Sequence, residues 1–130
     1  MVTQCGTDIL HAASLLREDR IVAIPTETVY GLAGNALHEK TIREIFRVKK
    51  RPVTNPLILH TTGAEAACSF TGEWPEWAKS LASVFWPGPL TMLLKKKPLV
   101  PDLLTAGSPR VAIRVPSHPM CRPLLDMLDF

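Results

Sequence analysis

Four short runs of apolar and β-branched residues, separated by stretches long enough for helices, constrain the fold of this 130-residue chain most strongly. Their length and composition are typical of buried strands, and they occupy residues 21–24, 57–60, 90–94 and 111–115. Helical patterns fall around them, at residues 8–19, 39–50, 75–86 and 120–128. This alternation predicts an α/β domain built around a central sheet.

The helical segments also carry signals for where they begin and which side they bury. Thr7 or Asp8 is placed to cap the first helix. In the segment 75–86, Pro75 suits the first helical position. The large residues expected to face the core there are Trp77, Leu81 and Phe85.

Composition narrows the function classes. No apolar run reaches the roughly 18–20 residues needed to cross a bilayer, and the first residues lack the pattern of a secretory signal. Three cysteines without a C-x-x-C pair argue against a disulfide framework or a zinc knuckle, and they favour the cytoplasm. A net charge of +3 suits anionic ligands but is low for a dedicated nucleic-acid binder.

The first strand runs into an unusually polar stretch, I-P-T-E-T-V-Y-G-L-A-G-N (24–35). Ligands of α/β sheets gather at the carboxyl ends of strands, and this stretch offers hydroxyls from Thr26 and Thr28 and a carboxylate from Glu27. An ordinary turn, in which the threonines accept hydrogen bonds from backbone amides, explains the same residues equally well.

A second polar segment, residues 48–60, places three cations at the end of a helix. Lys49, Lys50 and Arg51 could clamp a phosphate chain, although a solvated helix end is the common alternative. Asn55 lies on a proline-stiffened loop, and His60 ends the strand that follows. A histidine that merely completes the rim of the sheet is the alternative for His60.

A third segment, residues 105–119, contains an arginine inside an apolar strand. Arg114 is costly there unless an anion pairs with it, and the two candidates are Glu27 and a ligand carboxylate, of which we favour the ligand. Arg110 precedes the same strand, whereas His118 is expected to act as a capping residue. The turn F-W-P-G-P-L-T (85–91) is interpreted as scaffold.

The motifs of familiar catalytic centres are absent from the sequence: it has no P-loop, no G-x-G-x-x-G, no H-E-x-x-H and no cysteine–histidine signature. The polar groups bind anions and amides and are not nucleophiles. We therefore expect no catalytic side chain and no protein-bound metal, and a reaction driven by the positioning of activated substrates.

Taken together, four motifs resemble the YrdC/Sua5 family, the threonylcarbamoyl-AMP synthases. They are P-T-E-T-V-Y-G-L (25–32), K-K-R-P-x-x-N-P-L-I-L-H (49–60), F-W-P-G-P-L-T (85–91) and V-A-I-R-V-P-S-H-P (111–119). The resemblance covers about residues 8–128 and implies a twisted open mixed sheet with flanking helices, of the YrdC/RibB-like type.

The resemblance also implies an activity: L-threonine, bicarbonate and ATP give L-threonylcarbamoyladenylate and pyrophosphate, for the t6A modification of adenosine 37 in tRNA. By motif position, the residues implied to bind threonine are Thr28, His60 and Arg114. Those implied to bind ATP are Lys49, Arg51, Asn55 and Arg110. Mg²⁺ is expected with the ATP, and the t6A-transferase machinery is an implied partner. Arg114 and the cations at 49–51 are expected to share one hollow.

The family continues with a strand and an S-x-N element, and this sequence ends at Phe130 without one. We therefore expect residues 1–130 to be the N-terminal portion of a single YrdC-like domain that lacks its C-terminal strands. The further expectations are weak or absent catalysis and self-association through an exposed sheet edge.

Three alternatives remain. Hydrogenase-maturation carbamoyltransferases contain a related domain, but their zinc-finger and acylphosphatase regions are absent from this sequence. A module that binds tRNA or double-stranded RNA would use the basic residues, without an interleaved aromatic platform. A non-functional fragment is the third alternative.

Overall fold

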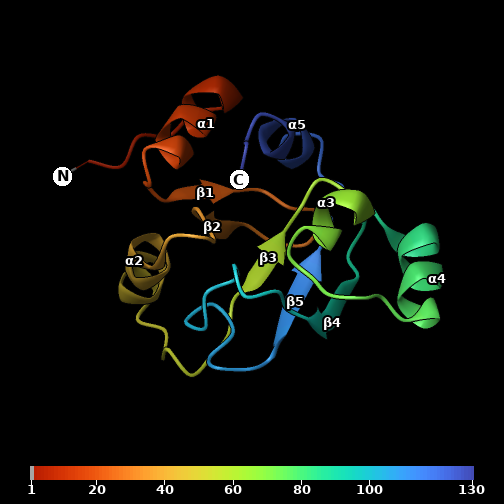
Figure 1. Cartoon of the computed structure of the whole chain (residues 1–130). Helices are drawn as coiled ribbons and strands as arrows, with labels where there is room; N and C mark the ends of the chain where they lie inside the picture. Colours follow the sequence, from red (N-terminus) through yellow and green to blue (C-terminus); the bar gives the residue numbers. More distant parts are fainter. Residues whose placement is uncertain (1) are drawn as a thin grey trace.

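The computed structural model describes residues 2–130, which form an α/β arrangement of helices around two small sheets (Figure 1). The helices are α1 (Ile9–Arg17), α2 (Glu39–Lys49), α3 (Ala64–Cys68), α4 (Glu76–Phe85) and α5 (Cys121–Asp126). The strands are β1 (Val22–Ile24), β2 (Gly31–Ala33), β3 (Ile58–His60), β4 (Thr91–Lys95) and β5 (Arg110–Arg114). The predicted α/β class is confirmed, although two sheets stand where the pattern predicted one.

The larger sheet has the strand order β3-β5-β4 and is mixed, as expected. Strand β3 runs parallel to β5, and β4 runs antiparallel to it. One face of this sheet packs into the main core, because Leu59, Ile113 and Met92 form a cross-strand row that is almost wholly buried. The alternation of exposed and buried residues along β4 matches this arrangement, because successive side chains of a strand point to opposite faces.

The opposite face, which we call the open face, carries three further rows of side chains, since residues paired across strands point to the same side. A polar row, an apolar row and a cationic row follow one another along the strands. They consist of His60, Arg114 and Thr91, then Ile58, Ala112 and Leu93, then Arg110 and Lys95. Ile58 and Leu93 are 44% and 53% exposed, so no helix covers the middle of this face.

The smaller sheet is a β-hairpin that the sequence did not predict. Strand β2 folds back onto β1 with Val22 opposite Ala33 and Ile24 opposite Gly31. The turn between them is held by Thr26, whose Oγ1 accepts hydrogen bonds from the backbone amides of Thr28 and Val29 at 3.3 and 3.2 Å. The alternative of an ordinary turn is therefore correct for Thr26.

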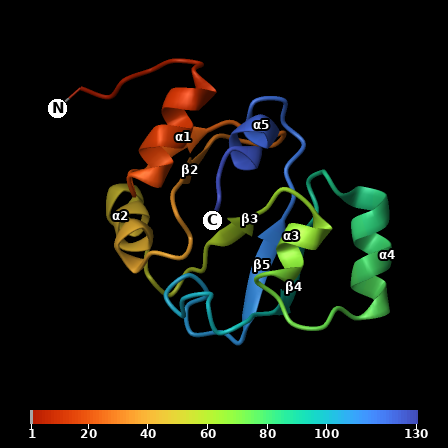
Figure 2. The ribbon, with the colours of Figure 1, turned by 45° about the horizontal axis from the view of Figure 1, so that its top comes forward.

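Helices α1 and α5 lie side by side against the hairpin, at opposite ends of the sequence (Figure 2). Asp8 is the residue that caps α1, because its carboxylate accepts hydrogen bonds from the amides of Leu10 and His11 at 2.9 and 3.2 Å. A second apolar cluster joins the two helices to β1, with Ala13, Leu16, Ile24, Cys121 and Leu124 buried at its centre.

Helix α4 packs only partly as predicted: Leu81 contacts the main core, but the two aromatic residues expected beside it are exposed. Trp77 and Phe85 are each 52% exposed, whereas Ala78 and Ala82 face the core at 0% and 6%. The alanines let the helix axis approach the sheet closely, and the neighbouring Trp74 and Trp86 fill the remaining space. Their rings meet edge to face, with centroids 5.7 Å apart.

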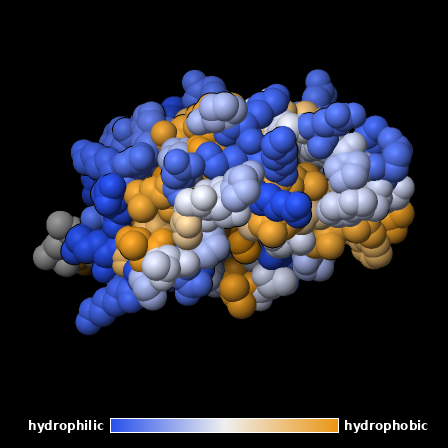
Figure 3. Space-filling view, turned by 60° about the horizontal axis from the view of Figure 1, so that its bottom comes forward, coloured by the Kyte–Doolittle hydropathy of each residue, from blue (hydrophilic) through white to orange (hydrophobic). Residues whose placement is uncertain are grey.

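The face shown in Figure 3 carries hydrophobic patches among hydrophilic areas. Within residues 2–130, no helix has the length and apolar character required to cross a membrane.

Candidate functional site

Arg114, at the end of β5, is the most deeply buried charged side chain of the candidate site, with 10% of its side chain exposed. Its Nη2 donates to Oε1 of Glu27, which lies in the turn after β1. The second oxygen of Glu27 accepts a hydrogen bond from the amide of Ser117 at 2.8 Å. Of the two partners considered for Arg114, the structure therefore shows Glu27, and the ion pair explains how a guanidinium can lie in an apolar strand.

The hydrogen bonds of Arg114 are nevertheless incomplete. Thr28 Oγ1 lies 3.3 and 3.4 Å from Nη2 and Nη1, at the outer limit of a useful contact. The Nε of Arg114 is buried and has no acceptor among the described residues. A buried donor without a partner costs free energy, so this nitrogen marks a place where a ligand oxygen would be stabilising.

His60 stands beside Arg114, because β3 and β5 pair His60 with Arg114 directly across the parallel ladder. Burial lowers the pKa of the His60 imidazole, although a hydrogen bond with the backbone of Ile58 opposes that effect. The ring is therefore neutral at pH 7, and it can contact a ligand without adding charge.

Thr91 completes this row and was missed by the sequence interpretation, which treated its segment as scaffold. It is the antiparallel partner of Arg114 on β4, and it is exposed on the open face. The available signal was the alternation of exposed and buried residues along 91–95, which assigns Thr91 to the side opposite Met92.

Burial also acts on the groups around Arg114. It lowers the pKa of the guanidinium, with an opposing contribution from Cys121. It raises the pKa of the Cys121 thiol, against the effect of the nearby cations Arg114 and Arg122. An arginine stays protonated in proteins, so burial of this charge makes the ion pair with Glu27 stabilising.

The residues implied to bind ATP lie elsewhere. Lys49 is the exposed last residue of α2, and Lys50 ends that helix in the left-handed conformation with φ at 50°. Arg51 donates to the carbonyl oxygens of Asn55 and Pro56 at 3.1 and 2.8 Å. The guanidinium of Arg51 is therefore held by its own loop, while the side chain of Asn55 is not part of that contact.

Arg110 begins β5 and belongs to the same open face as Arg114, four residues away, which corresponds to about 13 Å along a strand. It lies directly opposite Lys95, another exposed cation. No carboxylate among the described residues pairs with either of them. Like charges placed opposite one another repel, so this pair favours an anion between them.

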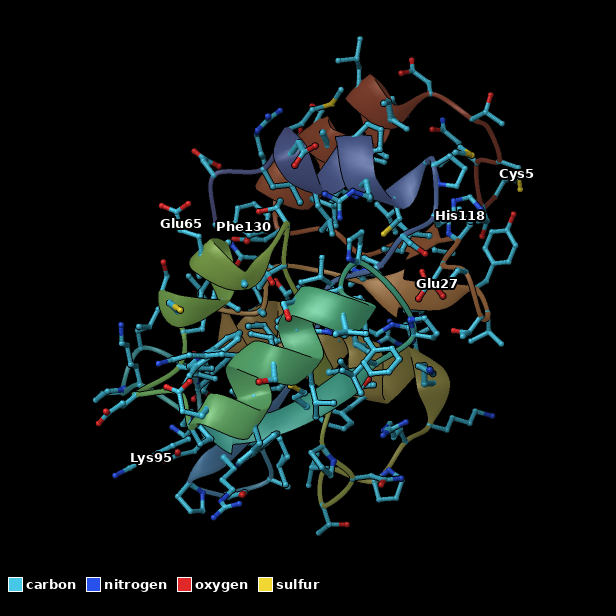
Figure 4. All side chains as sticks on the ribbon, turned by 90° about the vertical axis from the view of Figure 1, so that its right-hand side faces the viewer. Cys5, Glu27, Glu65, Lys95, His118 and Phe130 are labelled. Atoms are coloured by element: carbon cyan, nitrogen blue, oxygen red, sulfur yellow. The ribbon has the colours of Figure 1, made fainter. Side chains whose placement is uncertain are left out.

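The structure thus separates the two predicted sets. Because β3 and β5 are parallel, Thr28, His60 and Arg114 gather at their carboxyl ends, and the loop before β3 and Arg110 gather at their amino ends. Figure 4 shows this separation through Glu27, which lies at the right of the view, and Lys95, which lies at the lower left. The two sets do not touch, so the expectation of one hollow shared by Arg114 and the cations at 49–51 is not met, although Arg110 and Arg114 share one face.

A hollow of about 620 Å³ lies away from both residue sets, between α3, α4 and the end of β5. Its lining includes Trp74, Trp86, Val115 and Arg122, and none of the predicted site residues contributes to it. Within residues 2–130, no three side chains of His, Cys, Asp or Glu come together as metal ligands.

Comparison with known proteins relates these features to a family. A family model named Sua5/YciO/YrdC, described as telomere recombination, matches residues 14–130. A threonylcarbamoyl-AMP synthase of Pyrococcus abyssi is 47% identical over 118 residues, which cover 91% of this chain and 35% of that protein. A threonylcarbamoyl-AMP synthase of Bacillus subtilis is also 47% identical, over 90% of this chain and 34% of that protein.

A crystal structure of P. abyssi Sua5 complexed with L-threonine superimposes with a TM-score of 0.89 at 46% identity. The match covers 92% of this chain and 35% of that one. The chain thus spans about a third of the length of these relatives. The family match extends over nearly the whole sequence and the fold agrees with it, so the chain belongs to the Sua5/YciO/YrdC family.

Proposed function

We propose that this chain carries the threonine-binding part of a threonylcarbamoyl-AMP synthase, with Arg114 as the residue that binds the threonine carboxylate. One observation carries the proposal: the buried Arg114 has an Nε without an acceptor, beside Thr28 and His60. A carboxylate oxygen is the acceptor that suits a guanidinium best. The P. abyssi structure with L-threonine supports a threonine ligand.

The surrounding groups suit a small polar amino acid. Thr28 and Thr91 supply hydroxyls, and the neutral His60 supplies an uncharged imidazole ring. These groups can bind a second carboxylate oxygen and the threonine hydroxyl without adding a further charge to the site.

We assign ATP to the amino ends of β3 and β5, where Lys49, Arg51, Asn55 and Arg110 lie. The unneutralised pair Arg110 and Lys95 supports an anion there. Arg51 would exchange its two loop carbonyls for phosphate oxygens. Mg²⁺ would enter as the ion of the nucleotide.

The chemistry follows from positioning alone. The threonine amine attacks bicarbonate, and loss of water leaves a carbamate. A carbamate oxygen then attacks the α-phosphorus of ATP and displaces pyrophosphate. The threonylcarbamoyladenylate would serve the t6A modification of tRNA in the cytoplasm, through the t6A-transferase machinery.

Calorimetric titration with L-threonine tests this proposal, with Arg114→Lys as the variant. Lysine keeps the charge but loses the planar fork, so we expect at least about tenfold weaker threonine binding. Arg43→Lys, an exposed substitution on α2, is the matched control and should change nothing. Unaltered threonine affinity in Arg114→Lys would refute the assignment, and pyrophosphate release dependent on threonine and bicarbonate would test the full reaction.

The exposed cations Lys95 and Arg110 favour a second candidate, a module that binds tRNA or double-stranded RNA. Such binding would weaken steeply as salt increases, because it depends on the release of counterions. A salt titration of tRNA binding, compared with ATP and threonine calorimetry, separates the two candidates.

A further inference from the structure

We propose that Glu27 binds the α-ammonium group of the amino-acid ligand while Arg114 binds its carboxylate, so that the ligand enters a preformed ion pair. This inference rests on the proposed function. That function assigns a partner to the carboxylate of threonine but none to its ammonium group, and the inference supplies one. Nothing in the sequence motifs distinguishes this role of Glu27 from a purely structural one.

The hydrogen bonds of Glu27 leave room for this role. Its Oε1 accepts from Arg114 Nη2, and its Oε2 accepts from the Ser117 amide at 2.8 Å. A carboxylate offers about four lone-pair positions, so each oxygen can accept another hydrogen bond. The Glu27 side chain is 18% exposed, so part of it is accessible from outside.

The hydrogen bonds of Arg114 are complementary. Nη2 is occupied by Glu27, whereas Nε is buried without an acceptor. The guanidinium therefore keeps one N–H without an acceptor, and the carboxylate can accept a hydrogen bond from a further donor. An α-amino acid carries both groups on a single carbon, at the spacing of a contact ion pair.

The charges lead to the same ligand class. The pair of Arg114 and Glu27 is neutral, and an amino-acid zwitterion is neutral, so their association adds no net charge to a half-buried site. A ligand with only a carboxylate would bring a second anion close to Glu27, and the repulsion would oppose binding.

The neighbouring cation does not alter this conclusion. Arg122 donates to the carbonyl oxygens of Pro116 and Thr62, both at 3.3 Å. Its guanidinium is therefore already engaged by backbone groups, and Glu27 remains the carboxylate that contacts Arg114.

A paired substitution in protein and ligand tests the inference. The protein variant is Glu27→Gln, which keeps the shape of the side chain and removes its charge. The two ligands are L-threonine and 3-hydroxybutanoate, which retains the carboxylate and the hydroxyl but lacks the amine. Binding is measured by calorimetry, and Glu65→Gln, an exposed carboxylate on α3, is the matched control.

We expect Glu27→Gln to weaken threonine binding at least about tenfold while 3-hydroxybutanoate binds equally well or better. Equal losses for both ligands would mean that Glu27 acts only by holding Arg114, and this result would overturn the inference. Unchanged threonine binding would overturn it as well.

The wild-type protein gives a second measurement that does not depend on the folding of the variant. It should bind 3-hydroxybutanoate at least about tenfold more weakly than threonine, and equal affinities would contradict the role of Glu27. If the wild type binds threonine but without this selectivity, only the inference fails. If it binds neither ligand, the proposed function fails with it.

Discussion

At the scale of single residues, the candidate site depends on one turn in which neighbouring side chains have different tasks. Thr26 stabilises the turn itself, because its hydroxyl serves the amides of Thr28 and Val29 and donates to the carbonyl of Val29 at 2.7 Å. Thr28 is exposed and faces Arg114. The two hydroxyls lie 3.1 Å apart, but only that of Thr26 contacts the backbone of the turn and only that of Thr28 contacts Arg114.

This division predicts that two conservative substitutions affect different properties, the first stability and the second threonine binding. Thr26→Val removes the turn hydrogen bonds and should lower the free energy of unfolding by about 1 kcal/mol. Thr28→Val should leave stability within about 0.5 kcal/mol and weaken threonine binding. Urea unfolding and calorimetry measure the two effects, and a stability loss in Thr28→Val equal to that in Thr26→Val would contradict the division.

His60 makes a second residue-scale prediction. Burial lowers the pKa of His60 below its ordinary value, so the unfolded chain binds more protons than the folded one at mildly acidic pH. The free energy of unfolding should therefore decrease as the pH falls from about 7 to about 5.5. His60→Gln should flatten this slope, whereas His11→Gln, an exposed substitution on α1, should not. A slope that is identical in all three proteins would refute the role of burial.

At the scale of elements, the hairpin is positioned by the packing of α1 and α5. Leu16 and Leu124 are 2% and 3% exposed in the shared cluster, next to Ile24 at the end of β1. The guanidinium of Arg17 also donates to the carbonyl oxygen of Met127. Since Glu27 follows β1 by three residues, this helix pair determines where the turn presents its carboxylate.

Leu16→Ala therefore tests the second cluster. Loss of a fully buried leucine should lower the free energy of unfolding by about 2–5 kcal/mol. Leu10→Ala on the same helix is the control, because Leu10 is 68% exposed and should change stability little. Thermal unfolding of both variants gives the comparison, and similar small losses would mean that α1 does not contribute to the core.

At the scale of the whole molecule, the open face of the β3-β5-β4 sheet is the dominant feature. It presents a polar end, an apolar centre and a cationic end on one side. Ile58 and Leu93, at its centre, are 44% and 53% exposed, and β3 pairs with no strand other than β5 among the described residues. An uncovered apolar face beside an unpaired strand favours association with another surface.

We expect the 130-residue chain to self-associate at high concentration through this face and edge. The double substitution Ile58→Lys and Leu93→Lys should reduce the association, because charges on both strands oppose the burial of this face. Light scattering over a concentration series measures it. A monodisperse wild-type monomer at the highest concentration would be evidence against the prediction.

The sequence by itself determined the α/β class and the approximate positions of four helices and four strands, and it narrowed the cap of α1 to Thr7 or Asp8. These features follow from local chemistry, because the period of the apolar residues, β-branching and the capping side chains all act within a few residues of the chain. His118 also follows this rule, since its Nδ1 accepts a hydrogen bond from the amide of Met120 at 3.1 Å.

Only the tertiary structure decided the partner of Arg114, the position of Thr91 and the orientation of α4. Glu27 and Arg114 are 87 residues apart, and no local pattern encodes their contact. Thr91 belongs to the site because the register of β4 and β5 places it opposite Arg114. Trp77 and Phe85 point outward because the buried alanines of α4 bring that helix close to the sheet. Register and packing distance are set by all the elements together, so they depend on long-range contacts that residue patterns do not specify.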